Sequence, residues 1–265
     1  MLSGYRVIIT GATSGIGLAT AKEFLNQGAK VIGMGRNFTK TEGLGENFTA
    51  FKCDVTQESE IIAAVKFAKE KFGAVDSLIC NAGSAITGNT ENVDAEDFER
   101  GFKLYLNSHA MFTKYAVPLL RKSKNPSITH TASVASFMIG DSIPYNVLKA
   151  ALLNYTRQSA AGLLNKNPVD ISGRPTGVAP LLEGENPYIR VNAVCPGLIR
   201  TNLMPDAAWE ALGTDEALKA IPSRRIGEDW EVAKLFAFLA SPKAGFITGA
   251  TITIDGGWWT THARV

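Results

Sequence analysis

Short apolar runs alternate with helical patterns along most of this chain, and this alternation limits the folds open to it. The runs expected to be strands span residues 5–10, 30–35, 50–53, 75–80, 127–132, 190–195 and 251–255. The stretches with helical periodicity span residues 16–27, 58–72, 96–121, 145–164 and 228–240. The strand runs are rich in Val, Ile and Ala, which is typical of strands buried on both faces. The sequence therefore predicts an α/β fold, a doubly wound, mostly parallel seven-stranded sheet with helices on both faces.

Length and composition favour one domain over residues 1–265. Of the 265 residues, 45% are hydrophobic and 20% are charged, and the chain shows neither an internal repeat nor an interdomain linker. The 27 basic and 25 acidic residues give a net charge of +2, which is too balanced for a nucleic-acid partner. No apolar stretch is long enough to cross a membrane, and the N-terminus lacks the apolar core of a signal peptide.

The cysteines favour a reducing compartment. Cys53, Cys80 and Cys195 lie far apart, in or beside apolar runs, and no Cys or His spacing is typical of a zinc site. We expect buried free thiols, no bound metal and a cytoplasmic location.

Two segments interrupt the regular alternation. Residues 165–189 contain Pro168, Pro175, Pro180 and Pro187, which predicts an irregular insertion. The insertion leads into the start of a parallel strand, whereas ligands bind at the carboxyl ends of strands. We therefore expect it to lie away from the pocket, so that Arg174 and Leu181 touch no ligand, and to cover surface or reach a neighbouring subunit. Residues 198–225 are expected to form a lid over the site.

A glycine-rich turn follows the first expected strand and opens the first helix. Gly11, Gly15 and Gly17 leave room for a phosphate at the helix N-terminus, where free N–H groups and the helix dipole attract an anion. Ser14 and Ile16 complete this turn. A turn of this kind within a strand-turn-helix unit predicts a dinucleotide-binding, Rossmann-type fold.

The end of the second expected strand indicates which dinucleotide binds. An acidic residue there would bond the ribose 2′-hydroxyl of NAD(H), but this strand ends in Gly35 and Arg36. A guanidinium can bind a 2′-phosphate through two hydrogen bonds, which favours NADP(H) over NAD(H). Ser14 is a weaker candidate for the same phosphate. The alternative is that Arg36 only stacks on the adenine, which is compatible with NAD(H).

A second constellation indicates acid–base chemistry. Tyr145 and Lys149 are spaced by four residues, so they lie on one face of the expected helix. A nearby ammonium favours the phenolate, so we expect Lys149 to lower the pKa of Tyr145 and make it a usable acid or base. Ser133 follows the fifth expected strand, where its hydroxyl could hold a substrate oxygen.

With these motifs in this order, the chain resembles the short-chain dehydrogenase/reductase family in its single-domain form, over nearly its whole length. The matching residues are Thr10, Gly11, Gly15, Ile16 and Gly17 in the cofactor turn, Asp54 and Val55, Asn81, Ala82 and Gly83, the tetrad Asn107, Ser133, Tyr145 and Lys149, Pro196, Gly197, Ile199 and Thr201, and the closing Asp255, Gly256 and Gly257. The resemblance implies a dinucleotide-binding catalytic domain with residues that contact the adenine (Asp54 and Val55) and the nicotinamide (Pro196 to Thr201).

The resemblance also implies a mechanism for carbonyl reduction with NADPH. Tyr145 would protonate the carbonyl oxygen while Ser133 positions it. Lys149 would hold the nicotinamide ribose and lower the phenol pKa. Asn107 would anchor a water that relays protons, and Thr201 would bond the carboxamide.

Substrate contacts are expected from the segments after the strand ends. These residues are largely apolar, which favours a hydrophobic carbonyl compound or secondary alcohol, although the same residues could simply pack in the core: Phe137, Met138, Ile139, Leu198, Leu203, Met204 and Trp209. The helical stretches 98–121 and 145–164 are apolar on more than one face, which predicts a homodimer or homotetramer. Two other functions stay open: a sensor that binds NADP(H) without turnover, and a non-redox lyase or epimerase.

Overall fold

Seven parallel strands form the central sheet of the structure, a computed structural model that describes residues 2–140, 142–163, 172, 184–186 and 188–262. Their order across the sheet is β3-β2-β1-β4-β5-β6-β9. The bounds are β1 Arg6–Thr10, β2 Lys30–Gly35, β3 Phe48–Lys52, β4 Ser77–Cys80, β5 Ser127–Thr131, β6 Arg190–Pro196 and β9 Thr251–Ile254. The chain winds outward in both directions from the β1–β4 pair, which confirms the expected doubly wound α/β fold and places the ligand crevice at the carboxyl ends of these strands.

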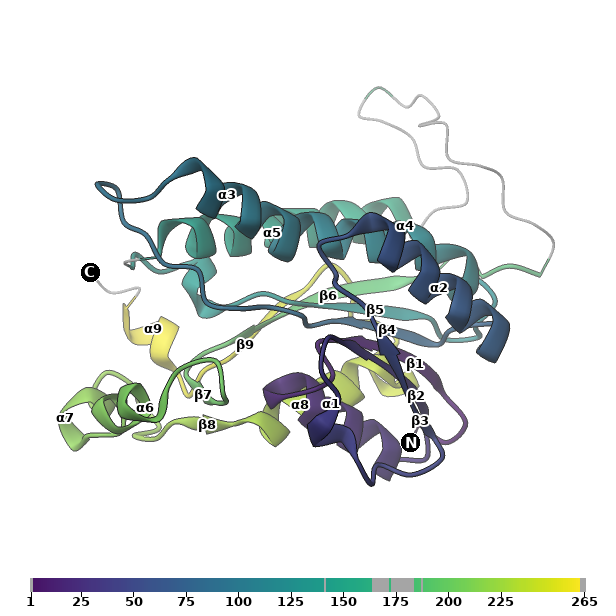
Figure 1. Cartoon of the computed structure of the whole chain (residues 1–265), viewed down its shortest axis with the longest axis horizontal. Coiled ribbons are helices and arrows are strands. Elements are labelled where there is room, and N and C mark those ends of the chain that lie inside the picture. Colours follow the sequence, from purple (N-terminus) through teal and green to yellow (C-terminus); the bar gives the residue numbers. More distant parts are fainter. Residues whose placement is uncertain (1, 141, 164–171, 173–183, 187, 263–265) are drawn as a thin grey trace.

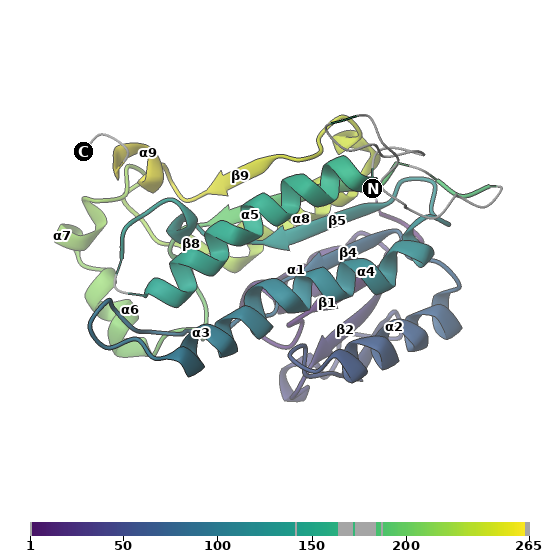
Figure 2. The same cartoon turned by 90° about the horizontal axis from the view of Figure 1, so that it is seen from above.

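Helices cover both faces of the sheet (Figure 1; Figure 2). On one face lie α2 Glu58–Phe72, α3 Ala95–Gly101, α4 Ser108–Leu120 and α5 Ile143–Leu163, and on the other lie α1 Gly15–Asn26 and α8 Asp229–Ala240. Smaller elements gather at one end of the molecule: α6 Asp206–Leu212, α7 Asp215–Leu218, α9 Trp258–His262, and the paired short strands β7 Ile199–Arg200 and β8 Gly227–Glu228. Single turns of 3-10 helix occur at η1 Thr39–Thr41, η3 Val134–Ser136 and η4 Pro242–Ala244.

The stretch expected to be one helix over 96–121 is divided into three parts. A π-helical segment, η2 Phe102–Asn107, lies between α3 and α4. The backbone N–H of Ser108 donates to the carbonyl of Lys103, five residues earlier, so this turn holds one residue more than an α-helical turn. The apolar pattern alone does not distinguish such a turn from a regular helix.

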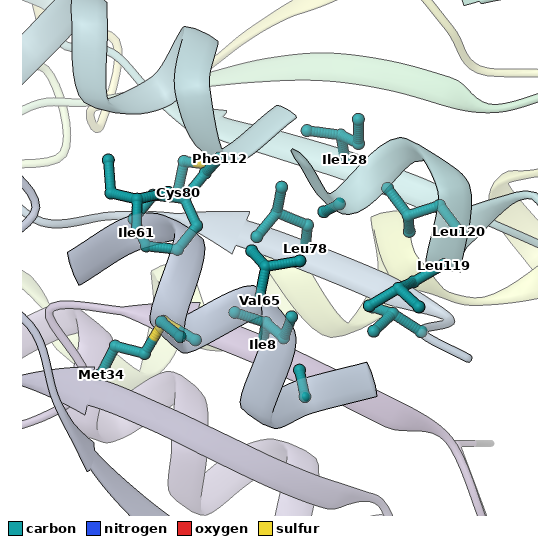
Figure 3. Packing of buried hydrophobic residues seen from close by; sticks show 14 of the residues in the cluster. Ile8, Met34, Ile61, Val65, Leu78, Cys80, Phe112, Leu119, Leu120 and Ile128 are labelled. Atoms are coloured by element: carbon teal, nitrogen blue, oxygen red, sulfur yellow. The ribbon is translucent and has the colours of Figure 1, made fainter. Parts of the chain in front are cut away.

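Apolar side chains from both helix layers bury the two faces of the sheet. On the α2–α4 face, Ile8, Leu78 and Ile128 from the strands pack against Ile61 and Phe112 from the helices (Figure 3). A second cluster fills the α1–α8 face, with Val7, Phe24 and Phe236 fully buried. Each of these side chains stabilises the fold by about 1.5–3 kcal/mol through burial, which holds the strand ends in fixed relative positions.

The segment around residues 165–189 falls largely outside the described residues. The expectations for Arg174 and Leu181 therefore stay predictions. Within the described part of the chain, none of the helices is both long enough and apolar enough to cross a membrane. Cys53, Cys80 and Cys195 are buried free thiols, as expected.

Candidate active site

The glycine-rich turn connects β1 to α1 and leaves the helix N-terminus open. Gly15, the first residue of α1, has a φ angle of +47°, a conformation that side chains disfavour. Ser14 is the N-cap, but its hydroxyl accepts no backbone hydrogen bond, and no acidic residue lies in the first turn. The N–H groups and the positive end of the helix dipole are therefore available to an anion such as a pyrophosphate.

Gly17 provides the close approach between α1 and the turn. A Cβ atom on Gly17 would lie 2.0 Å from the carbonyl oxygen of Gly11 and 2.6 Å from the amide nitrogen of Asn81. We expect Gly17→Ala to destabilise the fold by about 1–3 kcal/mol, because the turn must move to admit the methyl group. Urea unfolding followed by circular dichroism measures the change.

Gly162 in α5 gives a matched control, since a Cβ there meets nothing within 4 Å. Gly162→Ala should stabilise the protein slightly, by about 0.5 kcal/mol, because alanine loses less backbone entropy in a helix. Equal stabilities for the two alanine variants would contradict the close approach at Gly17.

The end of β2 presents an exposed cation. Arg36 directly follows Gly35, and its side chain is exposed. The charge of Arg36 contributes to the pKa of the Asp54 carboxyl. Burial raises this pKa, but hydrogen bonds from Thr56 and the charge of Arg36 outweigh burial, so the pKa is lowered. Thr56 donates to Asp54 Oδ1 from its backbone N–H at 2.9 Å and its hydroxyl at 2.8 Å. Asp54 therefore caps a turn, and its expected contact with adenine stays a prediction, as does that of the buried Val55.

The segment after β4 closes the crevice beside the glycine-rich turn. The backbone N–H groups of Asn81 and Ala82 both donate to the Thr10 hydroxyl, at 2.9 and 3.1 Å. The Thr131 hydroxyl donates to Asn81 Oδ1 at 3.4 Å, which ties the ends of β4 and β5 together. Asn81 and Ala82 therefore lie between the cofactor turn and the end of β5, and the expected contact of Asn81, Ala82 and Gly83 with a cofactor stays a prediction.

Ser133, Tyr145 and Lys149 converge at the carboxyl ends of β5 and β6. Ser133 caps η3 by accepting a hydrogen bond from the backbone of Ala135 at 3.1 Å, and its side chain also hydrogen-bonds to Tyr145. Tyr145 and Lys149 lie one turn apart in α5. Lys149 is 3% exposed, and its ammonium donates to the carbonyl of Thr131 at 2.6 Å and lies 5.7 Å from the centre of the Tyr145 ring.

Burial controls the titration of this group. Burial lowers the pKa of Lys149 to about 8, although the neighbouring Cys195 opposes the shift. Burial raises the pKa of Tyr145, and the hydrogen bond with Ser133 offsets this only in part. The net shift of the Tyr145 pKa is upward, opposite to the expected lowering, because burial disfavours the phenolate more than the bond with Ser133 favours it.

Asn107 does not join this group among the described residues. It is half-buried at the end of η2 and makes no hydrogen bond to Lys149 or Tyr145. Tyr105, two residues earlier, is fully buried and packs edge-on against the Tyr145 ring, with 5.3 Å between centroids. Its contact was missed in the sequence because the helical periodicity hides the π-helical turn. The relay role of Asn107 stays a prediction.

The segment that follows β6, from Gly197 to Thr201, lies beside the glycine-rich turn. Gly197 donates to the carbonyl of Ile254 at 3.0 Å, and a Cβ on Gly197 would lie 2.7 Å from Asp255. Thr201 lies against Gly15, since a Cβ on that glycine would come within 3.0 Å of it. Ile199 and Pro196 are buried, and the Thr201 hydroxyl accepts a bond from Leu203, so a contact with a carboxamide stays a prediction.

The expected substrate residues differ in exposure. Ile139 is fully exposed and Leu203 is 49% exposed, whereas Trp209 is buried and donates to the carbonyl of Thr201 at 2.8 Å. Phe137 is half-buried and stacks on Trp259, with 5.1 Å between centroids. Residues 198–225 contain β7, α6 and α7 beside the site, where the expected lid role stays a prediction.

A hollow of about 510 Å³ lies elsewhere, along the loop from Asn37 to Gly45 and the adjacent β3 strand. None of the catalytic candidates lines it. Cys80, His109 and His130 form a buried group whose ligand atoms lie within 4.8 Å of one another. The two rings already hydrogen-bond to each other through Nδ1 at 3.1 Å, so we assign them to the core rather than to a metal.

Comparisons with known proteins agree with this geometry. Residues 5–180 match the model of the short chain dehydrogenase family, and residues 183–259 match a model described as enoyl-(acyl carrier protein) reductase. Oxidoreductase UcpA of Salmonella typhimurium is 33% identical, with 97% of this chain and 95% of that protein covered. Dehydrogenase/reductase SDR family member 4 of Rattus norvegicus is 30% identical, with 94% and 85% covered.

Solved structures of other proteins share the fold, and two of them serve as examples. Aldohexose dehydrogenase of Thermoplasma acidophilum has a TM-score of 0.81 and 30% identity, covering 100% of this chain and 97% of its own. The 3-ketoacyl-(acyl-carrier-protein) reductase of Brucella melitensis, solved with NADH, has a TM-score of 0.81 and 29% identity, with 98% and 100% covered. The open turn before α1, the buried Tyr-Lys pair and the family matches lead to one conclusion: this chain is an oxidoreductase of the short-chain dehydrogenase/reductase family.

Proposed function

We propose that the protein is an NADP(H)-dependent oxidoreductase that interconverts a carbonyl group and a secondary alcohol on a mainly apolar substrate. The observation that carries this proposal is the convergence of Ser133, Tyr145 and Lys149 beside the open N-terminus of α1. A phenol and a hydroxyl in one hydrogen-bonded pair suit a reaction in which a carbonyl oxygen gains a proton.

The residues present fit a nicotinamide dinucleotide. The N-terminus of α1 offers uncapped N–H groups to the pyrophosphate, and Arg36 offers a guanidinium to a phosphate on the adenosine ribose. Lys149 would hold the nicotinamide ribose hydroxyls, and the segment from Pro196 to Thr201 would contact the nicotinamide.

The chain's own groups then divide the work. When bound, the reduced cofactor supplies the hydride that the carbonyl carbon accepts. Tyr145 donates its hydroxyl proton to the carbonyl oxygen, which turns C=O into CH–OH. Ser133 hydrogen-bonds the same oxygen and orients it. A raised pKa keeps Tyr145 protonated near neutral pH, as an acid in reduction must be.

Arg36 decides the cofactor preference in this proposal. We expect Arg36→Ala to lower kcat/KM for NADPH by about ten- to a hundredfold while changing kcat/KM for NADH less than about threefold, because only NADPH carries the 2′-phosphate. Steady-state kinetics with both cofactors measure the effect. Lys40→Ala removes another exposed cation nearby and should change neither value. Equal losses with both cofactors would contradict NADP(H) preference and favour stacking of Arg36 on the adenine.

The substrate class is tested by a panel of carbonyl compounds. The exposed or half-buried apolar residues after β5 and β6 (Phe137, Met138, Ile139, Leu198, Leu203 and Met204) favour apolar ketones over sugars, in contrast to the sugar named for the Thermoplasma structure. NADPH oxidation is followed at its absorbance maximum with apolar ketones, ketoesters and aldoses. Faster turnover of aldoses would contradict the apolar assignment, and an unchanged absorbance with every compound would favour a sensor or a non-redox lyase.

The same proposal extends to assembly and location. Val147 on α5 is 51% exposed and Phe102 on η2 is 47% exposed, which supports pairing of these helices in a homodimer or homotetramer. The buried free thiols are compatible with a reducing compartment, and we place the enzyme in the cytoplasm. Size-exclusion chromatography with light scattering measures the oligomeric state.

A further inference from the structure

Tyr105 lies against both members of the Tyr-Lys pair. Its side chain is fully buried, and its ring meets Tyr145 at an interplanar angle of 90°, with 5.3 Å between centroids. The Lys149 Nζ lies 5.0 Å from the centre of the Tyr105 ring, nearer than its 5.7 Å to the Tyr145 ring. Both distances fall within the range of a favourable cation–π contact.

The Tyr105 ring is held in place from two sides. Its hydroxyl donates to the carbonyl of Ser84, in the segment that follows β4. Ile86 and Leu148 pack beside the ring in a small buried cluster of their own. The π-helical turn η2 carries the residue into this place, since it shifts the helix by one residue just where Tyr105 lies.

The surroundings of Lys149 explain why an aromatic face matters there. The groups that face its ammonium are the two tyrosine rings, Cys195 from β6, and His109 and His130 from α4 and β5. Among the described residues no carboxylate pairs with it, Cys195 has a pKa raised to about 12 by burial, and burial keeps both histidines neutral. The aromatic faces and the carbonyl of Thr131 are therefore what stabilise the buried ammonium.

We propose that Tyr105 is a positioning residue of the active site, whose ring keeps Lys149 charged and fixes the orientation of Tyr145, while its hydroxyl only anchors the ring. This inference rests on the proposed function for its kinetic consequences. The Tyr105 hydroxyl is already engaged with the carbonyl of Ser84, so it anchors the ring and transfers no proton to the substrate.

Two substitutions separate the ring from its hydroxyl. Tyr105→Leu keeps an apolar filler and removes the aromatic face, and Tyr105→Phe keeps the face and removes the hydroxyl. In the wild-type protein the alkaline limb of kcat/KM for ketone reduction should lie near pH 8, where Lys149 loses its proton. We expect Tyr105→Leu to lower the pH of this alkaline limb by about one unit, because the Lys149 ammonium loses a cation–π partner. Tyr105→Phe should leave the limb in place. We also expect Leu to lower kcat more than it raises KM.

A titration independent of turnover accompanies the kinetics. Proteins labelled with 13Cε-lysine are followed by NMR as the pH is raised, and the Lys149 signal is identified by its loss in Lys149→Met. The Lys149 midpoint should fall by about one pH unit in the Leu variant and stay constant in the Phe variant. Tyr105→Met, a flexible apolar filler, replaces the Leu variant if that protein does not fold.

The outcomes are distinct. A Lys149 midpoint that is equal in the wild-type, Phe and Leu proteins would overturn the inference, and so would a shift that is equally large with Phe and Leu. A wild-type protein without turnover on any carbonyl compound would overturn the proposed function, and the NMR titration would still decide the role of the Tyr105 ring.

Discussion

Tyr145→Phe is expected to lower kcat for carbonyl reduction by about 10²–10⁴-fold while leaving the affinity for NADPH within about twofold of the wild-type value. In the proposed reaction the phenol of Tyr145, which hydrogen-bonds with Ser133, donates its proton to the carbonyl oxygen, and phenylalanine removes that proton without removing the ring. The ring packing against Tyr105 is retained, so the fold of the site should not change. Stopped-flow kinetics measure kcat, and isothermal titration calorimetry measures NADPH binding.

Tyr155→Phe is the matched control for this experiment. Tyr155 belongs to the same helix, its ring lies 5.6 Å from the His130 ring between centroids, and its hydroxyl hydrogen-bonds with Ser159. Its loss should leave kcat within about twofold. Turnover of Tyr145→Phe at the wild-type rate would eliminate the acid role of Tyr145, and equal losses in both phenylalanine variants would point to a folding defect.

A fall in pH from 6.5 to 4.5 is expected to reduce the free energy of unfolding by about 5 kcal/mol, which is comparable with the whole stability of many domains. The cause is the buried pair His109 and His130, on α4 and β5. Burial lowers the pKa of His109 well below its usual range and that of His130 to about 3, and the charge of Lys149 lowers both further. Below pH 6.5 the unfolded chain binds protons on these rings and the folded chain does not, so stability falls by about 1.4 kcal/mol per pH unit for each ring.

Substitution of the two rings checks this assignment. His109→Leu with His130→Val should flatten the dependence between pH 6.5 and 4.5, and each single variant should retain about half of it. Acidic groups contribute to the pH dependence of stability only at lower pH. Hydrogen bonds with arginine lower the pKa values of Asp76 and Glu231, although burial raises the pKa of Asp76. Urea unfolding at a series of pH values measures the slope. An unfolding midpoint that is constant over this range in the wild-type protein would show that the rings take up protons in the folded state.

The layered fold could be predicted from the sequence because its strands are short, continuous apolar runs. Runs such as Arg6–Thr10 and Arg190–Pro196 are apolar enough to need cover on both faces, and the helical stretches between them provide it. The long helices were located within a few residues, and α2 was located to the residue. The short elements α6, α7 and α9 were not predicted, because four to seven residues give too little periodicity.

The candidate site could be predicted in its members but not in its contacts. Ser133, Tyr145 and Lys149 do converge, since strand ends and helix spacing determine their positions. The direction of the Tyr145 pKa shift was not predicted, because residue spacing along a helix does not reveal how deeply the phenol is buried from solvent. Tyr105 was missed because its orientation depends on a backbone hydrogen-bond pattern that side-chain polarity does not encode.

The wide turn at Phe102–Asn107 has a consequence for the whole length from Ala95 to Leu120. One additional residue rotates everything after it by about 100° around the helix axis relative to an uninterrupted coil. After the turn, α4 can therefore keep its apolar side chains against β4 and β5. Before the turn, α3 can direct a different set of side chains toward α5. Deleting a single residue here would restore a regular α-helix and would turn the Tyr105 ring away from Tyr145 and Lys149. A regular helix over this stretch and the observed Tyr105 contacts therefore exclude each other.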